Sequence, residues 1–324
     1  MPKEDKVVEG TAQHQLIVGE AQKRGFEVEE KACSEGKQLT ILKKGNHQEK
    51  IYSGIPESWV NDNTAEICDQ KQLTKQLFQE IEIPTPISFR FQLAEDLDEE
   101  VFRTGKNYIC KPEVGTNGKG VEFDIKNLDH VKGYLQRNSA IADTFLLEEF
   151  VSGEDLRLQI IGRKIVAACV RKPASVIGDG QYTLSKLIEK RQAEVQAQNP
   201  ANRLEIDEQS KELIRLSNYS LADVIPENTE IRLKKIANMG QGAKAIDVTD
   251  EIDPALQHWV NRISTALQAP YFALDIISKD PSNEKECVAL ELNLRAEWMH
   301  HTFSEKRTHD LAKTVIDELF GPEK

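Results

Sequence analysis

Three oxygen-bearing side chains near the C-terminal end have the spacing of a cation site. Asp275 follows the apolar run Tyr271-Phe-Ala-Leu, and Glu291 and Asn293 alternate with leucines in Ala289-Leu-Glu-Leu-Asn-Leu. Period-two spacing places Glu291 and Asn293 on one face of a strand. A buried carboxylate is costly unless it is paired or bound to a cation, and Mg²⁺ prefers oxygen ligands. We therefore favour a magnesium site over an exposed polar strand face.

A glycine-rich loop between two expected strands has the composition of an anion-binding loop. It runs from Lys111 to Gly120 as Lys-Pro-Glu-Val-Gly-Thr-Asn-Gly-Lys-Gly. Glycines let backbone N–H groups approach an anion closely, and Lys111 and Lys119 would supply compensating charge. The loop lacks the Walker spacing and leads into a strand instead of a helix, which excludes a Walker-type loop. A plain hairpin turn is an equal alternative at this point.

A third segment could meet a nucleotide where a strand ends in Glu148 and Glu149. The chain continues through Phe150 and Val151 to Asp155. Backbone groups at a strand end can bond a purine edge, and a later carboxylate can hold a ribose diol. From these residues alone, a strand end with solvated acids is favoured over a nucleotide site.

Two adjacent histidines, His300 and His301, follow Trp298-Met. On a strand or loop they would point in opposite directions, so a zinc ion shared by both would need a third ligand. Core packing is the simplest role, and contact of one histidine with phosphate or substrate is the alternative.

Composition narrows the class of protein. The 324 residues predict two or three lobes, and 42 Lys+Arg against 54 Asp+Glu give a formal charge of −12. An acidic surface repels nucleic acid and anionic lipid, so we expect neither as a partner. We find no apolar run near the roughly 20 residues of a membrane span and no signal peptide. The five cysteines are far apart without a CxxC pair, which indicates buried reduced thiols and a cytoplasmic protein.

The elements that must position these residues follow from periodicity and turn residues. We expect helices over about 64–81, 94–103, 128–138, 254–267 and 307–320, and strands over 87–91, 107–111, 121–125, 144–151, 156–161, 164–170, 230–235, 271–278 and 286–292. Gly162 splits two of these strands into a hairpin. The charged helical stretch 184–226 indicates an insertion. Hairpins mixed with helices favour an α+β fold over a doubly wound sheet.

The order of these motifs resembles the ATP-grasp superfamily of carboxylate–amine ligases, and within it the ligase modules of bifunctional glutathione synthetase and of cyanophycin synthetase. The most diagnostic stretch begins at Arg171 and reads Arg-x-Pro-Ala-x-Val-x-Gly-Asp-Gly-x-x-Thr-x-x-x-Leu-Ile. Similarity runs from about residue 62 to the end. The resemblance implies an α+β ATP-grasp fold with the nucleotide held between subdomains 64–147 and 148–324, beside a small N-terminal α/β lobe at 1–63.

The resemblance also implies a role for each matching position. The ATP phosphates would contact Lys71 and Lys111. A mobile flap over them would include Gly115, Gly118, Lys119 and Gly120. The adenosine would be surrounded by Glu148, Glu149, Phe150, Val151 and, at the ribose, Asp155. Two cations, Arg171 and Lys234, would act near the γ-phosphate and the acyl phosphate. Magnesium would be bound by Asp275, Glu291 and Asn293.

The chain departs from those modules at the positions expected to contact substrate. It has Ile236-Ala-Asn-Met-Gly-Gln-Gly-Ala where they have Asn-Ser-Asn-x-Ser-Thr-Gly-Gly, and Leu294-Arg-Ala-Glu-Trp-Met-His-His where they have a proline-containing turn. We therefore expect substrate contacts from Asn238 and Arg295. The resemblance itself implies that Arg157 faces the carboxylate substrate.

The implied activity is an ATP- and magnesium-dependent ligase that joins an amine to an amino-acid or peptide carboxylate through an acyl phosphate. Addition of glycine to γ-glutamylcysteine, as in glutathione synthetase, is one candidate. The alternatives are an enzyme that modifies a peptide or protein terminus and a non-catalytic nucleotide-binding regulatory module. The expected partners are ATP and small substrates, with a homodimer as a further hypothesis.

Overall fold

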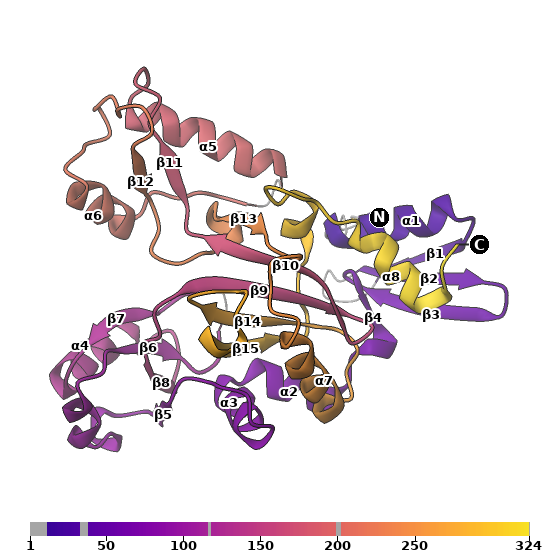
Figure 1. The fold of residues 1–324 in the computed structure, drawn as a ribbon, viewed down its shortest axis with the longest axis horizontal. Coiled ribbons are helices and arrows are strands. Elements are labelled where there is room, and N and C mark those ends of the chain that lie inside the picture. Colours follow the sequence, from indigo (N-terminus) through magenta and orange to yellow (C-terminus); the bar gives the residue numbers. More distant parts are fainter. Residues whose placement is uncertain (1–11, 33–37, 116–117, 199–201, 324) are drawn as a thin grey trace, which may run out of the picture.

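The protein is built around a five-stranded antiparallel sheet in the computed structural model, which describes residues 12–32, 38–115, 118–198 and 202–323 (Figure 1). The strand order is β13 (Lys244–Asp247), β10 (Lys164–Lys172), β9 (Glu154–Ile161), β14 (Phe272–Ser278) and β15 (Cys287–Asn293). Because side chains alternate along a strand, one face of this central sheet is apolar. That face packs against α7 (Leu256–Leu267), α2 (Asp62–Asp69) and α3 (Lys71–Glu80).

The hairpin predicted around Gly162 is confirmed and forms the middle of the central sheet. Strands β9 and β10 pair antiparallel from Ile161–Lys164 to Asp155–Arg171. Gly162 lies at the turn with φ +62°, and a Cβ there would meet the Glu318 carboxyl at 2.4 Å. The positive φ favours glycine, and any other residue would also have to displace the Glu318 carboxyl. The turn therefore fixes which residues of the two strands face each other.

A smaller four-stranded sheet lies on the other side of the site. Its order is β5 (Ser88–Phe91), β8 (Phe145–Glu149), β6 (Tyr108–Pro112) and β7 (Glu122–Ile125), and α4 (Leu128–Asn138) packs on it. Aromatic residues fill the layer between them, including Tyr134, which makes an edge contact with Phe145 at 5.3 Å between ring centroids. This core holds β6 and β8 rigidly side by side, and both carry predicted site residues.

The N-terminal lobe packs on one end of the central sheet. It consists of α1 (Ala12–Lys23), β1 (Glu27–Ala32), β2 (Gln38–Lys44), β3 (His47–Tyr52), β4 (Ile55–Pro56) and the C-terminal helix α8 (Leu311–Phe320). Its core continues into Ile161, Ala167 and Ala273 of the central sheet. This apolar contact covers one end of the second face of the central sheet, so the polar residues of that face lie toward the other end.

The predicted insertion forms a unit with a small core of its own. It contains β11 (Ser175–Ile177), α5 (Leu184–Gln198), α6 (Glu208–Leu216) and β12 (Glu230–Arg232). Gly178 allows the close approach of its two segments, since a Cβ there would meet the Pro226 carbonyl oxygen at 2.1 Å. The unit projects from β10 on one side of the molecule (Figure 1).

Several expected elements differ from those found. The helix expected over 94–103 is two short 3₁₀ pieces, Ala94–Asp96 and Glu99–Thr104, each started by a side-chain cap that turns the backbone locally. The single helix expected from residue 64 is broken at Gln70, which has extended dihedrals. Helix α1 and strands β11 and β13 were not predicted. Among the described residues, no helix is long and apolar enough to cross a bilayer.

Candidate active site

An arginine–carboxylate cluster occupies the open end of the central sheet's polar face. It consists of Asp155 and Arg157 on β9, Arg171 on β10, Asp275 on β14, and Glu291 and Asn293 on β15. Register brings them together: Arg171 pairs with Asp155, and Asp275 lies between Arg157 and Glu291. The structure thus joins six residues that are far apart in the sequence.

Ion pairs connect this cluster. Arg171 donates to the Asp155 carboxylate at 2.6 Å and lies 3.2 Å from the Asp275 carboxylate. Arg157 donates to Asp275 at 3.1 Å. Burial raises the pKa of Asp155 to about 6 against the opposing charge of Arg171. Burial acts in the same direction on Asp275, but Arg157 and Arg171 hold its pKa below the usual value. Asp275 is therefore an anion at neutral pH.

The predicted metal-binding residues lie next to one another. Asn293 donates to Asp275 at 3.2 Å, and Glu291 lies directly opposite Asp275 in the register of β14 and β15. Leu292, between the two β15 residues, is buried on the opposite face, as the alternation predicts. Two carboxyl groups this close require a proton or a cation between them. Since all three side chains offer oxygen atoms, the set fits a hard divalent cation such as Mg²⁺.

A lysine–glutamate cluster, defined by Lys71, Lys75, Lys111 and Glu148, faces this site from α3 and the smaller sheet. The Glu148 carboxylate is buried between Lys75 at 2.6 Å and Lys111 at 2.8 Å. Burial would raise the pKa of Glu148, but these two ammonium groups lower it. Burial also lowers the pKa of Lys75 to about 8. Glu148 is therefore the counter-ion of Lys75 and Lys111, and its contact with adenosine stays a prediction.

Lys75 is a residue that the sequence analysis missed. It lies one helical turn after Lys71 and one turn before Phe78 of the core, so all three share one face of α3. Its position in the apolar stripe of a helix was the sequence signal that could have indicated a buried, paired lysine. Lys71 itself donates to the carbonyl oxygens of Gly115 at 2.7 Å and Glu113 at 3.4 Å, which connects the helix to the glycine loop.

The two clusters are close enough to interact. Burial lowers the pKa of Lys71, the Glu291 carboxylate opposes that shift, and the Lys111 ammonium adds to it. Lys71 and Lys75 therefore lie within electrostatic reach of the Glu291 carboxylate on β15.

A cavity of about 630 Å³ adjoins the glycine loop. Its lining includes the loop residues Gly115, Gly118, Lys119 and Gly120, together with Lys234 and Asn238. Thr116 and Asn117 lie outside the described residues. Lys234 is buried and donates to Asp207 of the insertion at 2.6 Å. Asn238 accepts a hydrogen bond from the Gly240 N–H at 2.9 Å. The cavity thus lies between the glycine loop and the insertion.

The end of β8 leads from the smaller sheet into β9 of the central sheet. The N–H of Phe150 donates to the Asn107 carbonyl at 2.8 Å, and within the described ranges the Val151 N–H has no backbone acceptor. Phe150 is exposed and makes an edge contact with Phe123 at 6.1 Å between centroids. Glu149 pairs with Lys106 at 2.7 Å. One backbone donor and one aromatic ring are thus available to a ligand.

Comparison with known proteins decides the fold. No family model matches the chain. A crystal structure of a bifunctional glutathione synthetase from Pasteurella multocida superposes with a TM-score of 0.72 at 20% identity, covering 97% of this chain and 44% of that one. The chain has the ATP-grasp fold. This confirms the fold inferred from the order of the motifs.

Curated relatives support the same ATP-grasp resemblance. The chain is 28% identical over 265 residues to cyanophycin synthetase of Trichormus variabilis, which is 79% of this chain and 29% of that protein. It is 24% identical over 319 residues to the glutathione biosynthesis bifunctional protein GshAB of Streptococcus thermophilus, which is 94% of this chain and 42% of that protein. The chain therefore spans less than half the length of these relatives.

The residues after β15 include Arg295 and the two adjacent histidines noted in the sequence. Arg295 is exposed, and no contact among the described residues joins it to the arginine–carboxylate cluster. His300 and His301 lie in the short helix η7 (Met299–Thr302) and are buried. They face Cys169 of β10, a neighbour that sequence spacing does not indicate.

Proposed function

We propose that the protein is an ATP- and magnesium-dependent carboxylate–amine ligase. The observation that supports this most is the pairing of two clusters of opposite excess charge. The lysine–glutamate cluster has three ammonium groups and one carboxylate, and two of the three pair with it directly. The other cluster has two guanidinium groups and three carboxylates. An excess of positive charge suits polyphosphate, and an excess of negative charge suits the divalent cation that accompanies it.

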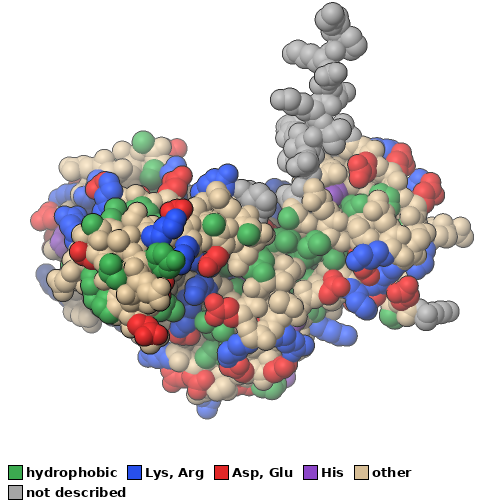
Figure 2. All heavy atoms as spheres, turned by 90° about the horizontal axis from the view of Figure 1, so that it is seen from above, with side chains coloured by type: hydrophobic (Ala, Val, Ile, Leu, Met, Phe, Trp, Pro, Cys, Tyr) green, Lys and Arg blue, Asp and Glu red, His purple; other side chains and the backbone are tan. Residues whose placement is uncertain are grey.

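ATP would lie between the clusters. Lys71 and Lys111 would contact its phosphates, and the loop from Gly115 to Gly120 would cover them. Adenine would accept a hydrogen bond from the Val151 N–H and pack near the Phe150 ring, while Asp155 would hold the ribose. Charged residues of both signs are mixed over the face in Figure 2. The net charge of −12 is a sum over the whole chain, and the excess of lysines would be confined to the ATP site.

The cation site would be formed by Asp275, Glu291 and Asn293. These three residues would hold magnesium, which would supply positive charge against the charge that develops on the transferring phosphoryl group. The arginines support this arrangement from the sheet, because Arg157 and Arg171 hold Asp275 ionised and fixed in position.

The reaction would proceed in two steps. A carboxylate oxygen of the first substrate attacks the γ-phosphorus, the bond to the β-phosphate oxygen breaks, and ADP leaves. The amine then attacks the acyl carbon, the bond to phosphate breaks, and the amine loses a proton as the amide forms. Arg157 would orient the carboxylate, Arg171 and Lys234 would stabilise the phosphoryl charge, and the closed glycine loop would exclude water.

The substrates are narrowed by chemistry to an amine and an amino-acid or peptide carboxylate. The relatives are a cyanophycin synthetase and a glutathione biosynthesis protein. The residues around Asn238 and Arg295 depart from those modules, which favours a substrate different from theirs. A peptide or protein terminus is the second candidate, and a cytoplasmic homodimer is the setting in which we propose that the enzyme works.

ADP release tests the proposal directly. The purified chain is incubated with ATP, magnesium and pairs drawn from a panel of amino acids, dipeptides and short peptides. We expect ADP formation that requires both a substrate and magnesium. Arg171→Gln should lower it by about 10²–10³-fold, whereas Arg103→Gln, at an exposed position in the 3₁₀ piece 99–104, should leave it unchanged.

Three results would change this proposal. ATP binding without ADP formation for any pair would favour the non-catalytic regulatory module. Equal ADP formation by the wild type and Arg171→Gln would remove Arg171 from the chemistry. ADP formation only with peptides that carry an accessible C-terminus would favour the terminus-modifying enzyme.

A further inference from the structure

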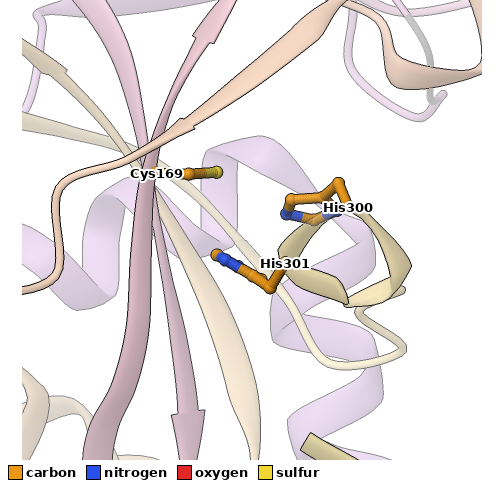
Figure 3. Close-up of side chains that lie close together, drawn as sticks. All are labelled: Cys169, His300 and His301. Atoms are coloured by element: carbon orange, nitrogen blue, oxygen red, sulfur yellow. The ribbon is translucent and has the colours of Figure 1, made fainter. Parts of the chain in front are cut away.

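Three potential metal ligands from separate parts of the chain meet beside the arginine–carboxylate cluster, on the same face of the central sheet. Cys169 lies on β10, and His300 and His301 lie on η7. One ligand atom from each residue falls within 4.8 Å of the other two. Figure 3 shows the Cys169 sulfur and the imidazole nitrogens turned toward one shared space. The histidines approach with ring centroids 4.3 Å apart, so both belong to one site despite being adjacent in sequence.

The histidine nitrogens are buried without hydrogen-bond partners. Cys169 and His301 are fully buried and His300 is 5% exposed. Among the described residues, His300 Nε2 and both ring nitrogens of His301 find no donor or acceptor. Each unsatisfied buried polar group costs about 1–3 kcal/mol. Packing alone gives no reason to place three such nitrogens beside a thiol, whereas a bound ligand would remove the cost.

The protonation states suit metal coordination. Burial lowers the pKa of His301 to about 3 and that of His300 well below its usual value. Both imidazoles are therefore neutral at pH 7, which is the form that coordinates a metal. Burial raises the pKa of the Cys169 thiol to about 12, and the nearby Arg171 and Arg157 oppose that shift. The arginines would thus stabilise the thiolate once a metal displaces its proton.

The segment that carries the histidines is held firmly against the central sheet. Glu305 forms a parallel bridge with Ile246 of β13, and the His309 N–H donates to the His301 carbonyl at 2.9 Å. His309 also contacts the Asp247 carboxylate at 2.5 Å, and Asp247 pairs with Cys169 across the strands. The ligands are therefore positioned by two anchored segments, which favours a preformed site.

We propose that Cys169, His300 and His301 bind a transition-metal ion of the zinc class. Thiolate and imidazole are the ligands that such ions prefer over magnesium. Zinc bonds of about 2.3 Å to sulfur and about 2.0–2.1 Å to nitrogen place tetrahedral ligand atoms about 3.3–3.6 Å apart, so small side-chain rotations bring the three together. On binding, the Cys169 S–H bond breaks, a metal–sulfur bond forms, and the proton passes to solvent. The fourth position is left to water or an added ligand.

The proposed ion would tie η7 to the strand that carries Arg171. Cys169 lies two residues before Arg171 on β10, and it pairs across the sheet with Arg157. The site is separate from the magnesium residues, since it uses soft ligands and none of Asp275, Glu291 or Asn293. Its existence does not depend on the ligase activity proposed above.

Cobalt titration of the full chain without ATP tests this site. Co²⁺ bound by a thiolate gives a sulfur-to-metal charge-transfer absorption, and tetrahedral Co²⁺ gives intense visible bands. We expect both to saturate at one equivalent, to disappear on addition of Zn²⁺, and to accompany release of one proton per ion at pH 7. Magnesium in excess should leave the bands unchanged.

Matched variants identify the ligands. Cys169→Ser should abolish the charge-transfer band, while Cys110→Ser, which removes an equally buried thiol on β6, should retain it. His301→Asn should weaken cobalt binding by about 100-fold or more, because loss of a group that only supports a ligand already costs about 10–100-fold. His130→Asn, at an exposed position of α4, is its control.

The wild type alone can overturn the proposal, so the test does not depend on the variants folding. Absence of a charge-transfer band up to millimolar Co²⁺ would mean that the space holds water or remains a packing contact. A band that persists in Cys169→Ser, or binding without proton release, would assign the ion to other residues.

Discussion

The lysine–glutamate cluster and the arginine–carboxylate cluster both combine buried and half-buried side chains, but they are stabilised differently. In the first, Lys75 and Lys111 depend on the single carboxylate of Glu148. In the second, Arg157 and Arg171 share the two oxygens of Asp275, and Asp155 adds another carboxylate. The first cluster therefore has one indispensable member, and the second distributes its charge over several strands. The first cluster has an excess of positive charge, which suits the proposed ATP phosphates. The second has an excess of negative charge, which suits the proposed magnesium ion.

The largest effect should come from Glu148→Gln, because it leaves two buried ammonium groups without a counter-ion. Breaking a buried pair by removing one partner costs about 3–5 kcal/mol. We expect a loss of this size in the free energy of unfolding, measured by urea denaturation. Glu189→Gln, which removes an exposed partner of Lys186, should cost about 0–1 kcal/mol. Similar losses in both variants would contradict the dependence on Glu148.

Lys111→Met tests whether the lysine–glutamate cluster serves ATP and not only the fold. Lys75 still pairs with Glu148 in this variant, so the cluster keeps one ion pair. We expect substrate-dependent ADP formation to fall by about 10²–10³-fold, the usual cost of one preorganised charge-stabilising group. Lys132→Met, at an exposed position of α4, should have the wild-type rate. Unchanged ADP formation by Lys111→Met would make the cluster purely structural.

The pH dependence of stability should reveal Lys75. Its pKa is lowered to about 8 in the folded protein, against about 10.4 in an unfolded chain. Between these values the unfolded state binds more protons, so the stability contributed by this group rises with pH across that window. The rise should be about 3 kcal/mol, at about 1.36 kcal/mol per pKa unit. Urea denaturation of the wild type and Lys75→Met between pH 8 and 10 measures the difference.

The control for that comparison is Lys132→Met, which should keep the wild-type pH dependence. A Lys75→Met variant with the same slope as the wild type would mean that Lys75 stays protonated throughout, held by Glu148.

Glu291→Gln acts on the arginine–carboxylate cluster, where the remaining carboxylates moderate the loss. We expect the magnesium concentration for half-maximal ADP formation to rise at least about tenfold. Glu154→Gln, an exposed position on β9 paired with Lys172, should leave the magnesium requirement unaltered. A Glu291→Gln enzyme with wild-type magnesium dependence would remove Glu291 from the metal site.

The parts of the site that could be predicted from the sequence depend on local patterns within single elements. Alternation along β15 places Glu291 and Asn293 together with Leu292 buried opposite, because strand periodicity is a local property. The β9–β10 hairpin was likewise signalled by Gly162. The ATP-grasp fold followed from the order of motifs, and the order survives at identities too low for most positions to match.

Contacts between residues far apart in the sequence could not be predicted from it. Lys75 lies in a helical pattern, but its partner Glu148 is 73 positions away in the printed sequence, and only packing of α3 on the smaller sheet joins them. The meeting of Cys169 with His300 depends on the bridge between β13 and Glu305. The helix expected over 94–103 failed because side-chain caps at Asp96 and Asp98 compete with helical hydrogen bonds.

Arg295→Ala should have the smallest effect. It tests whether substrate recognition extends beyond the arginine–carboxylate cluster. Arg295 is exposed and contributes little to packing, so stability should change by less than about 0.5 kcal/mol. If it binds the carboxylate substrate, its loss should raise KM by about two- to fivefold, the equivalent of one exposed ion pair, with kcat unchanged. Lys306→Ala, an exposed partner of Glu251, should leave both constants unaltered. Wild-type KM in Arg295→Ala would place substrate recognition within the buried arginines, Arg157 and Arg171.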